Sequence, residues 1–333
     1  MKKMIISLVV AMAVTTGFAQ SSILATLSHG DETTIFYGGS ALREAHAAAV
    51  NGDVITLSSG TFSSVNISKG ITIRGAGMEV NTTTQSEPTI ISGYFTINIP
   101  EETAEGLIIE GIYHDNSIAV EKAANAQFIK DRLYGVTTYN SNNHLMFTHC
   151  RISNELFVRN NNYATCVNCI IWNDVVITEG NYNWECINCV IKYGDGGWNT
   201  LDNSILKNCI LISPREYKID SSCTVYSCVN ISDEVVWPIF ENIPNTTNVS
   251  MLREESNLFK TYDGNYKETE NFELTEEAKT KYLGLDGTQV GIYGGSLPYD
   301  PTPSNPQITK CNVAAKSTAD GKLSVDIEVN IAK

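Results

Sequence analysis

The sequence has few basic residues for its size. Its 333 residues contain 23 Lys and Arg against 37 Asp and Glu, which gives a formal net charge of −14. Proteins that bind nucleic acids neutralise phosphates with basic side chains, so this balance argues against a nucleic-acid partner. It argues equally against long-range attraction of polyanions, and it leaves neutral sugars open as ligands.

Long hydrophobic runs are also missing, except at the start of the chain. Lys2 and Lys3 precede an apolar stretch over Met4–Val14, and a small-residue cleavage site ends at Ala19. This pattern is typical of a secretory signal peptide over residues 1–19, and the stretch is too short to span a membrane. We therefore expect a secreted protein, whether periplasmic, cell-surface or extracellular. Removal of the two lysines makes its formal charge −16.

What the sequence does contain is a hexapeptide that recurs at a nearly constant period. Successive copies begin 20, 19, 19, 20, 20 and 19 residues apart. They begin at Ile108, Phe128, Phe147, Cys166, Cys186, Leu206 and Val225. A fixed period of this length indicates a solenoid, in which each repeat buries its apolar face against its neighbours.

Two columns of the repeat define the expected coil. The third position is polar in every copy: Glu110, Lys130, His149, Asn168, Asn188, Asn208 and Ser227. The fourth is Gly111, Asp131 and then Cys150, Cys169, Cys189, Cys209 and Cys228. Apolar residues at the first and fourth positions cannot share one side of a straight strand, so the chain must bend at the polar position. Asn tolerates the left-handed backbone of a tight bend, so the pattern predicts a parallel β-helix with an internal cysteine ladder.

The same cysteines offer other interpretations. C-x-x-C occurs at Cys166–Cys169 and again at Cys186–Cys189, which is the spacing of a zinc ribbon. Phe147, Leu206 and Val225 replace the first cysteine in neighbouring copies, and a zinc ligand position does not accept them. Ladder packing is therefore favoured over zinc and over disulfides, although Cys223 and Cys228 could pair locally. The count of nine cysteines leaves at least one thiol unpaired within a monomer.

Both ends of the repeat region resemble a known family. A short helix expected over residues 40–50 precedes "GDVITLSSGTF" and "ITIRGAG", and "NFELTEEAKTKYLGLDGTQVGIYGG" closes the region at Gly295. These segments resemble secreted bacterial right-handed parallel β-helix proteins of the pectate-lyase-like group. The resemblance implies an all-β solenoid whose N-terminal helix caps the open end of the coil. It is specific for the fold and weak for function, because the fold hosts many activities.

The chain then divides into four parts. Residues 1–19 are the signal peptide, 20–297 the β-helix domain, 298–306 a Pro-rich linker and 307–333 a C-terminal β-hairpin tail. Leu323, Val325, Ile327, Val329 and Ile331 alternate in the tail as a strand would. An isolated hairpin is marginally stable, so we expect the tail to dock on the β-helix or to self-associate with another chain. Residues 232–265 break the repeat and are expected to form an excursion beside the last coils.

Acidic residues form one candidate site. Glu155, Asp174 and Asp195 recur shortly after the ladder cysteines, so stacked coils would bring these carboxylates together as a calcium site. Enzymes of the resembled group use calcium and an Arg or Lys base, which makes Asp174, Arg151 and Arg159 the candidate catalytic residues. A solvated column of acidic turns is the simpler interpretation.

The D-D, G-H-G and R-I-K motifs of the group's hydrolases are absent. The five histidines show no paired spacing for a metal.

Aromatic residues form the other candidate site. Trp172, Trp184, Tyr193 and Trp198 fall in neighbouring coils and could stack on sugar rings, although ordinary packing is the simpler interpretation. We therefore expect a carbohydrate-associated β-helix protein that binds a polysaccharide or glycan without cleaving it. Two alternatives stay open: a calcium-dependent polysaccharide lyase acting on acidic glycans, and a structural or adhesive surface protein that assembles through its tail.

Overall fold

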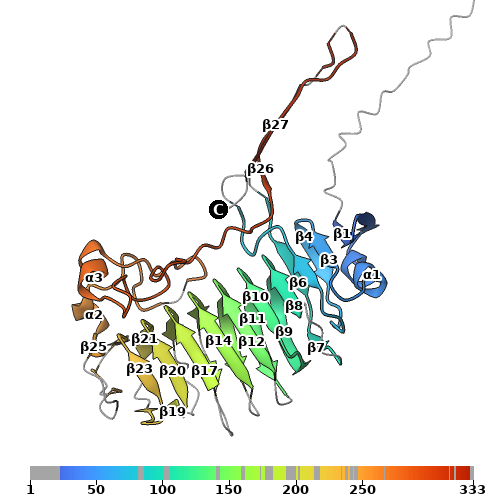
Figure 1. Ribbon diagram of the computed structural model, residues 1–333. Helices are drawn as coiled ribbons and strands as arrows, with labels where there is room; N and C mark the ends of the chain where they lie inside the picture. Colours follow the sequence, from blue (N-terminus) through green and yellow to red (C-terminus); the bar gives the residue numbers. More distant parts are fainter. Residues whose placement is uncertain are drawn as a thin grey trace, which may run out of the picture.

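The sequence repeat forms the coils of a parallel β-solenoid (Figure 1). The computed structural model describes residues 23–330, apart from gaps. The gaps are 82–85, 101–105, 140–142, 159–161, 173, 177–182, 193–199, 202, 214–217, 234, 237–238, 241–242, 244–246, 266, 315 and 319. None of the helices in the described part of the chain is long and apolar enough to cross a membrane.

Two long sheets make up most of the solenoid. Sheet A has eleven strands, in the spatial order β2 (Glu32–Tyr37), β1 (Leu24–His29), β3 (Val54–Leu57), β5 (Thr72–Arg74), β8 (Leu107–Glu110), β10 (Ala126–Ile129), β12 (His144–Thr148), β14 (Tyr163–Val167), β17 (Asn183–Ile187), β20 (Ser204–Lys207) and β23 (Thr224–Tyr226). From β3 onwards every neighbouring pair in sheet A is parallel and in register.

Sheet B has twelve strands and runs beside sheet A. Ten of them follow the order β25 (Val249–Leu252), β24 (Val229–Ser232), β21 (Ile210–Ser213), β18 (Val190–Lys192), β15 (Ile170–Ile171), β13 (Arg151–Phe157), β11 (Arg132–Thr138), β9 (Tyr113–Lys122), β6 (Thr89–Ser92) and β4 (Gly60–Ser63). The other two are β7 (Phe95–Asn98), which pairs with β9, and β16 (Asp174–Val176), which pairs with β13. A short pair, β19 (Thr200–Leu201) and β22 (Lys218–Ile219), lies at the far side of two late coils.

The predicted bend between sheets A and B is confirmed, and it is left-handed. Six residues of the polar column have φ between 50° and 56°: Lys130, His149, Asn168, Asn188, Asn208 and Ser227. The first copy was misplaced by one residue, because the register pairs Ile109, not Ile108, with Phe128. Gly111 therefore occupies the first bend, with φ 69°. Glycine adopts this backbone most readily, so its presence there agrees with the corrected register.

The predicted cysteine ladder is also confirmed. All five ladder cysteines have no solvent exposure and pack in the core inside the coils. Their thiols form no disulfide, and neither do those of Cys166 and Cys186. Each thiol is a small apolar group with a weak donor: Cys169 Sγ donates to the Phe147 carbonyl at 3.4 Å, and Cys209 donates its backbone N–H to Cys228 Sγ at 3.4 Å.

A carboxyl group precedes the cysteine ladder in the same column. Asp131 is completely buried one coil before Cys150, and its Oδ1 accepts the Ile112 N–H at 2.8 Å. On a later coil a cysteine accepts the equivalent hydrogen bond: Cys169 Sγ accepts the Cys150 N–H at 3.4 Å. Burial holds the pKa of Asp131 well above its usual value, because the charged form loses its hydration. This burial favours the protonated form of the carboxyl in the folded protein.

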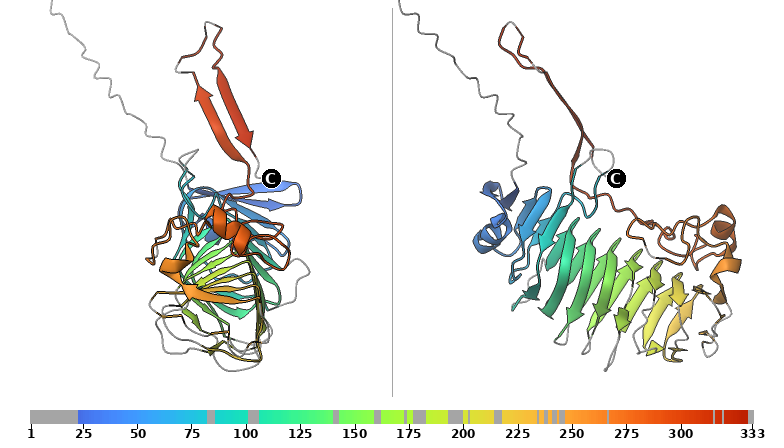
Figure 2. Two further views of the ribbon diagram at one scale, coloured as in Figure 1. Left: turned by 90° about the vertical axis from the view of Figure 1, so that its left-hand side faces the viewer. Right: turned by 180° about the vertical axis from the view of Figure 1, so that it is seen from behind.

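The N-terminal end is closed by the predicted helix together with a hairpin that was not predicted. Helix α1 (Ala41–Ala48) buries Leu42, Ala45 and the following Ala49, as the apolar stripe indicated. Ser40 precedes the helix, but its hydroxyl donates to Glu44 Oε1 at 2.7 Å and does not cap a backbone N–H. Strands β1 and β2 form an antiparallel hairpin, and β1 pairs with β3. Sheet A therefore extends beyond the first coil (Figure 2).

The expected excursion after the last cysteine is only partly correct. Strand β25 pairs with β24 in register, Val249 opposite Val229, so sheet B gains one more parallel strand there. Helix α2 (Arg253–Ser256) follows directly, and helix α3 (Glu276–Lys281) comes later. Strand β25 begins 20 residues after β24, so the period continues, but the sequence hid this coil because Asn248 stands at the ladder position that cysteine occupies in the preceding copies.

The following chain covers the outer face of sheet B. Outward-facing Ile170, Val190 and Ile210 pack in a second apolar cluster with residues of the C-terminal part of the chain. That part contributes Leu258, Tyr262, Phe272, Leu274, Ala278, Tyr282, Val290, Ile292 and Tyr299. The outer face of sheet A has no such cover, as the ribbon shows (Figure 2).

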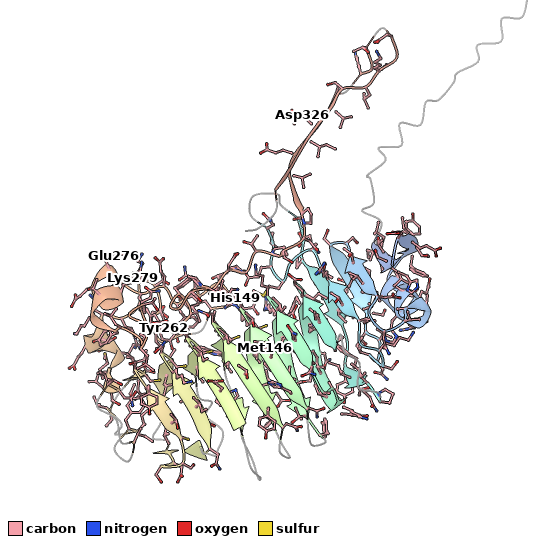
Figure 3. The ribbon with its side chains drawn as sticks, in the orientation of Figure 1. Met146, His149, Tyr262, Glu276, Lys279 and Asp326 are labelled. Carbon is pink, nitrogen blue, oxygen red and sulfur yellow. The ribbon has the colours of Figure 1, made fainter. Side chains whose placement is uncertain are left out.

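Residues 284–305 form a strap that runs back along the bends towards the N-terminal coils (Figure 1). Asn208 Oδ1 accepts the Leu285 N–H at 2.8 Å, and Asn168 Nδ2 donates to the carbonyls of Ile292 and Gly294 at 2.7 and 2.9 Å. His149 and Lys130 continue the series: His149 Nε2 lies 3.0 Å from the Leu297 carbonyl, and Lys130 Nζ donates to the Thr302 carbonyl at 2.6 Å. His149 is labelled under the strap in Figure 3. The Pro-rich segment 298–306 thus lies against the coils.

The tail follows the strap and points away from the solenoid (Figures 1 and 2). Strand β26 (Gln307–Val313) pairs antiparallel with β27 (Val325–Asn330), which confirms the predicted hairpin. Val325, Ile327 and Val329 are 51%, 53% and 50% exposed, so the expectation that the tail docks on its own β-helix is wrong.

We predict that Asp131→Cys stabilises the protein at pH 8 relative to wild type, because burial raises the pKa of Asp131 and an ionised carboxylate is costly in the core. Because the pKa of Asp131 is raised, its contribution to the free energy of unfolding is complete below the ordinary pKa of Asp. This contribution is progressively lost as the pH rises. The gain should therefore shrink towards pH 4. Urea unfolding across this range measures it, with Asp131→Asn as a control that keeps the Ile112 acceptor. A gain of equal size at both pH values would contradict the assignment.

We predict that Asn168→Ala destabilises the protein more than Asn168→Gly. Both variants lose the two amide hydrogen bonds to the strap, and each such bond contributes about 1 kcal/mol. Only alanine adds the cost of a left-handed residue, roughly 1 kcal/mol more. Denaturant unfolding of the two variants side by side tests this. Equal stabilities, or a more stable alanine variant, would show that the bend does not constrain the residue type.

Candidate functional site

The uncovered face of sheet A carries a pocket at the edge where its strands begin. The pocket has a volume of about 130 Å³ and lies over four strands, β12, β14, β17 and β20. Its lining residues are His144, Tyr163, Thr165, Trp184, Glu185, Asn203 and Ile205. Along β14, Tyr163 and Thr165 alternate with buried Ala164 and Cys166, which is why the polar and aromatic groups come to the outer face.

Tyr163 is the most exposed aromatic group of the pocket. Its ring is 48% exposed and meets the His144 ring edge-on, with centroids 6.2 Å apart. His144 and Tyr163 are register partners on adjacent strands, so the sheet itself fixes their spacing. Met146, labelled in Figure 3, lies two residues further along the same strand. An exposed tyrosine ring with a fixed neighbour is a suitable surface for the C–H face of a sugar.

Trp184 lines the same pocket, but from the inside of the coil. It is 2% exposed, and its register partners are Ala164 and Ser204, whose small size leaves room for the indole. Trp184 therefore offers no exposed ring face for stacking on a sugar. Its Nε1 has no hydrogen-bond acceptor among the described atoms.

Polar groups complete the lining. Glu185 follows Trp184 on β17 and points outward, where Lys207 Nζ donates to its Oε1 at 2.9 Å. Both side chains are about one-third exposed, at 33% and 35%. Asn203 sits in a left-handed bend, with φ 45°, directly before β20. The pocket thus combines one aromatic ring with hydroxyl, amide, imidazole and carboxylate groups, the kinds of side chain that hydrogen-bond sugar hydroxyls.

Trp172, another residue of the predicted aromatic site, is covered by the C-terminal part of the chain. Trp172 points out of the coil as expected, yet it is only 5% exposed because the C-terminal cluster packs over it. Its ring lies 5.9 Å from Tyr262 and 5.7 Å from Phe272, and Lys192 Nζ sits 4.8 Å from its centroid. Trp172 therefore has no free ring face for a glycan. Tyr193 and Trp198, the other two members, lie outside the described residues.

The predicted acidic column is only partly within the described residues. The register sets Glu155 directly opposite Asp174 on neighbouring coils, as the stacking argument expected. Thr137 Oγ1 lies 3.4 Å from Glu155 Oε1. Asp195 and Arg159 lie outside the described residues, so the full column stays a prediction. Within the described ranges, no three His, Cys, Asp or Glu side chains are arranged to hold a metal ion.

Arg151, the other candidate base, has a structural position. It is 3% exposed on the outer side of β13, beneath the chain that covers sheet B. Its Nη2 donates to the Glu270 carbonyl at 3.0 Å, and its Nε lies 3.6 Å from Glu79 Oε1. A guanidinium held in this way favours a structural role for Arg151 over the predicted role of a catalytic base.

A larger pocket of about 320 Å³ lies on the C-terminal segment and is lined by Glu273, Lys279, Gln289 and Tyr293. Its charges are already satisfied within the protein. Glu273 Oε1 accepts from Lys260 Nζ at 2.5 Å and from Lys279 Nζ at 3.3 Å, and the two lysines hold its pKa below the usual value. This arrangement favours a structural ion network over a ligand site.

Comparison of the chain with family models, curated proteins and solved structures finds no match. The site must therefore be judged from its own residues. Sequence reasoning missed His144, Tyr163, Glu185 and Asn203, although a signal was present. Glu185 directly precedes Cys186 and Tyr163 lies three residues before Cys166, so both occupy outward positions of their strands, and a search along that outward register would have found them.

We predict that Arg151→Met destabilises the protein by about 2 kcal/mol, because a buried charge-assisted hydrogen bond to the covering chain is lost. Lys267→Met removes an ion pair with Asp263 in which both side chains are about half exposed, 53% and 52%, and should cost less than about 1 kcal/mol. Thermal unfolding of both variants measures the difference. Loss of glycan binding in Arg151→Met without loss of stability would contradict the structural role.

Proposed function

We propose that this protein is an exported, non-catalytic β-solenoid of bacterial origin that binds a glycan at the pocket on sheet A. The residues expected to contact the glycan are His144, Tyr163, Glu185 and Asn203. The single observation that carries the proposal is the pocket's pairing of an exposed tyrosine ring with partly exposed hydrogen-bonding groups.

The lining favours binding over cleavage. Glycoside hydrolysis commonly needs two carboxyl groups that flank the bond to be broken. Among the lining residues of this pocket, Glu185 is the single carboxylate, and Lys207 already pairs with it at 2.9 Å.

The charge of the chain favours a neutral glycan. The formal net charge of −14 repels polyanions at long range, and Lys207, a cation close to the pocket, is already paired with Glu185. Neutral sugars do not feel this repulsion. The signal-peptide pattern over residues 1–19 supports the same proposal, because an exported protein meets cell-surface and extracellular polysaccharides.

A calcium-dependent lyase is the second candidate, supported by the register that sets Glu155 opposite Asp174. Two carboxylates on neighbouring coils could share a calcium ion. Such an enzyme would act on an acidic glycan and would need a base other than Arg151. An assay for unsaturated products, with and without calcium, separates this candidate from the binding proposal, since turnover that Asp174→Asn abolishes would favour the lyase.

We predict that Tyr163→Ala lowers the affinity for a neutral oligosaccharide by about tenfold or more, because the stacking ring is lost. Tyr226→Ala is the matched control. Tyr226 is another exposed tyrosine of sheet A, at 39%, and it does not line the pocket, so its removal should change affinity less than about twofold. Calorimetric titration with a panel of neutral and acidic oligosaccharides measures both. Equal losses in the two variants, or no binding by any neutral member, would contradict the proposal.

A further inference from the structure

The tail is a two-stranded ribbon in which residues pair by polarity. The register sets apolar residues opposite apolar ones: Val313 opposite Val325, Cys311 opposite Ile327, and Ile308 opposite Val329. It also sets Lys310 opposite Glu328 and Asn312 opposite Asp326. Strand β27 therefore carries an apolar row of Val325, Ile327 and Val329 that alternates with its acidic residues.

This apolar row has no cover in the described part of the chain. Its three side chains are each about half exposed, and Leu323 before the strand is 50% exposed as well. The ribbon stands clear of the solenoid, and Asp326 is labelled on it in Figure 3. A lone two-stranded hairpin is marginally stable in water, so burial of this row would stabilise the ribbon itself.

Edge-to-edge pairing of two identical ribbons is unfavourable. A two-fold pairing of β27 with its copy, centred on Ile327, sets Asp326 opposite Glu328 twice. The same pairing of β26, centred on Lys310, sets two lysines opposite each other. Like charges directly opposite on paired strands are destabilising. Face-to-face packing avoids both clashes, because the apolar rows meet and the charged rows stay in water.

The distribution of charge favours a second copy as the occupant. Residues 307–333 contain four lysines and three acidic residues, so they carry a formal charge of +1. The rest of the mature chain, 20–306, carries the remaining −17. Two copies repel each other wherever their solenoids approach, and the projecting ribbon can meet its copy while the solenoids stay apart.

We infer that two copies of this chain associate through the tail, with the Val325, Ile327 and Val329 rows of the two ribbons packed face to face. The symmetric contact is self-complementary and closes at a dimer. A two-stranded ribbon offers a small contact surface, so we expect a dimer whose population depends on protein concentration. This inference does not use the glycan pocket and stands or falls separately from it.

The experiment is sedimentation velocity of the full mature protein across a range of concentrations, under reducing conditions. Wild type should shift from monomer to dimer, and Ile327→Ser should raise the dissociation constant about tenfold or more. Glu328→Ser is the matched control, because it truncates the neighbouring residue of the charged row to the same side chain, and it should change the constant less than about twofold. An unchanged melting temperature checks that both variants keep the solenoid.

Cysteine cross-linking provides a second readout of the geometry. The register sets Cys311 opposite Ile327, at the middle of the ribbon, and the eight other cysteines are buried in the solenoid. Face-to-face ribbons lie about 10 Å apart, which is too far for a disulfide, so a bifunctional thiol reagent of about that span should yield a covalent dimer that Cys311→Ser abolishes. The inference is overturned if wild type stays monomeric at all concentrations, if it grows beyond a dimer, if Ile327→Ser and Glu328→Ser act equally, or if cross-linking does not depend on Cys311.

Discussion

The left-handed bend that joins sheet A to sheet B is the feature on which the rest of the structure depends. Six bend residues share φ values between 50° and 56°, so successive coils turn the corner in the same way and stack in register. The bend sends the residues on either side of it into the same interior, which places the cysteines in one ladder. It also points the polar side chains of the column outward, where the strap binds them coil by coil.

Because the strap lies along these bends and the segment before it covers sheet B, the outer faces of the two sheets differ. The strap and the preceding segment bury the outer face of sheet B, including Trp172 and Arg151. Gly291 allows the strap to pass Asn208 closely: its φ is 81°, and a Cβ there would lie 2.6 Å from Ile210 Cδ1. Sheet A stays open, so the pocket around Tyr163 lies on the face that a long polymer could approach. The projecting tail begins where the strap ends, which separates proposed assembly from proposed binding.

The repeated features of the fold could be predicted from the sequence. The features that depend on contacts between residues distant in sequence could not. The period, the bend column, the ladder and the capping helix could be read directly, because each is a local pattern imposed by strand alternation and backbone sterics. The first copy slipped by one residue because Glu110 and Gly111 both fit a bend. The Trp172 prediction failed because its cover comes from residues about 100 positions away, such as Tyr262 and Phe272. The burial of Trp184 was not foreseen, because it depends on small partners on adjacent coils, Ala164 and Ser204, which leave room for the indole inside the coil.

Hydrogen–deuterium exchange of the mature protein at low concentration tests the central claim, that the strap is bound to the bends. In the strap, Gly291 N–H donates to the Asn208 carbonyl at 2.8 Å, and Tyr299 N–H donates to Ile292 at 2.8 Å. The account predicts that peptides covering 284–305 exchange as slowly as the neighbouring coils, while peptides covering 307–330 exchange much faster. Rapid exchange across 284–305, as in a free linker, would contradict it.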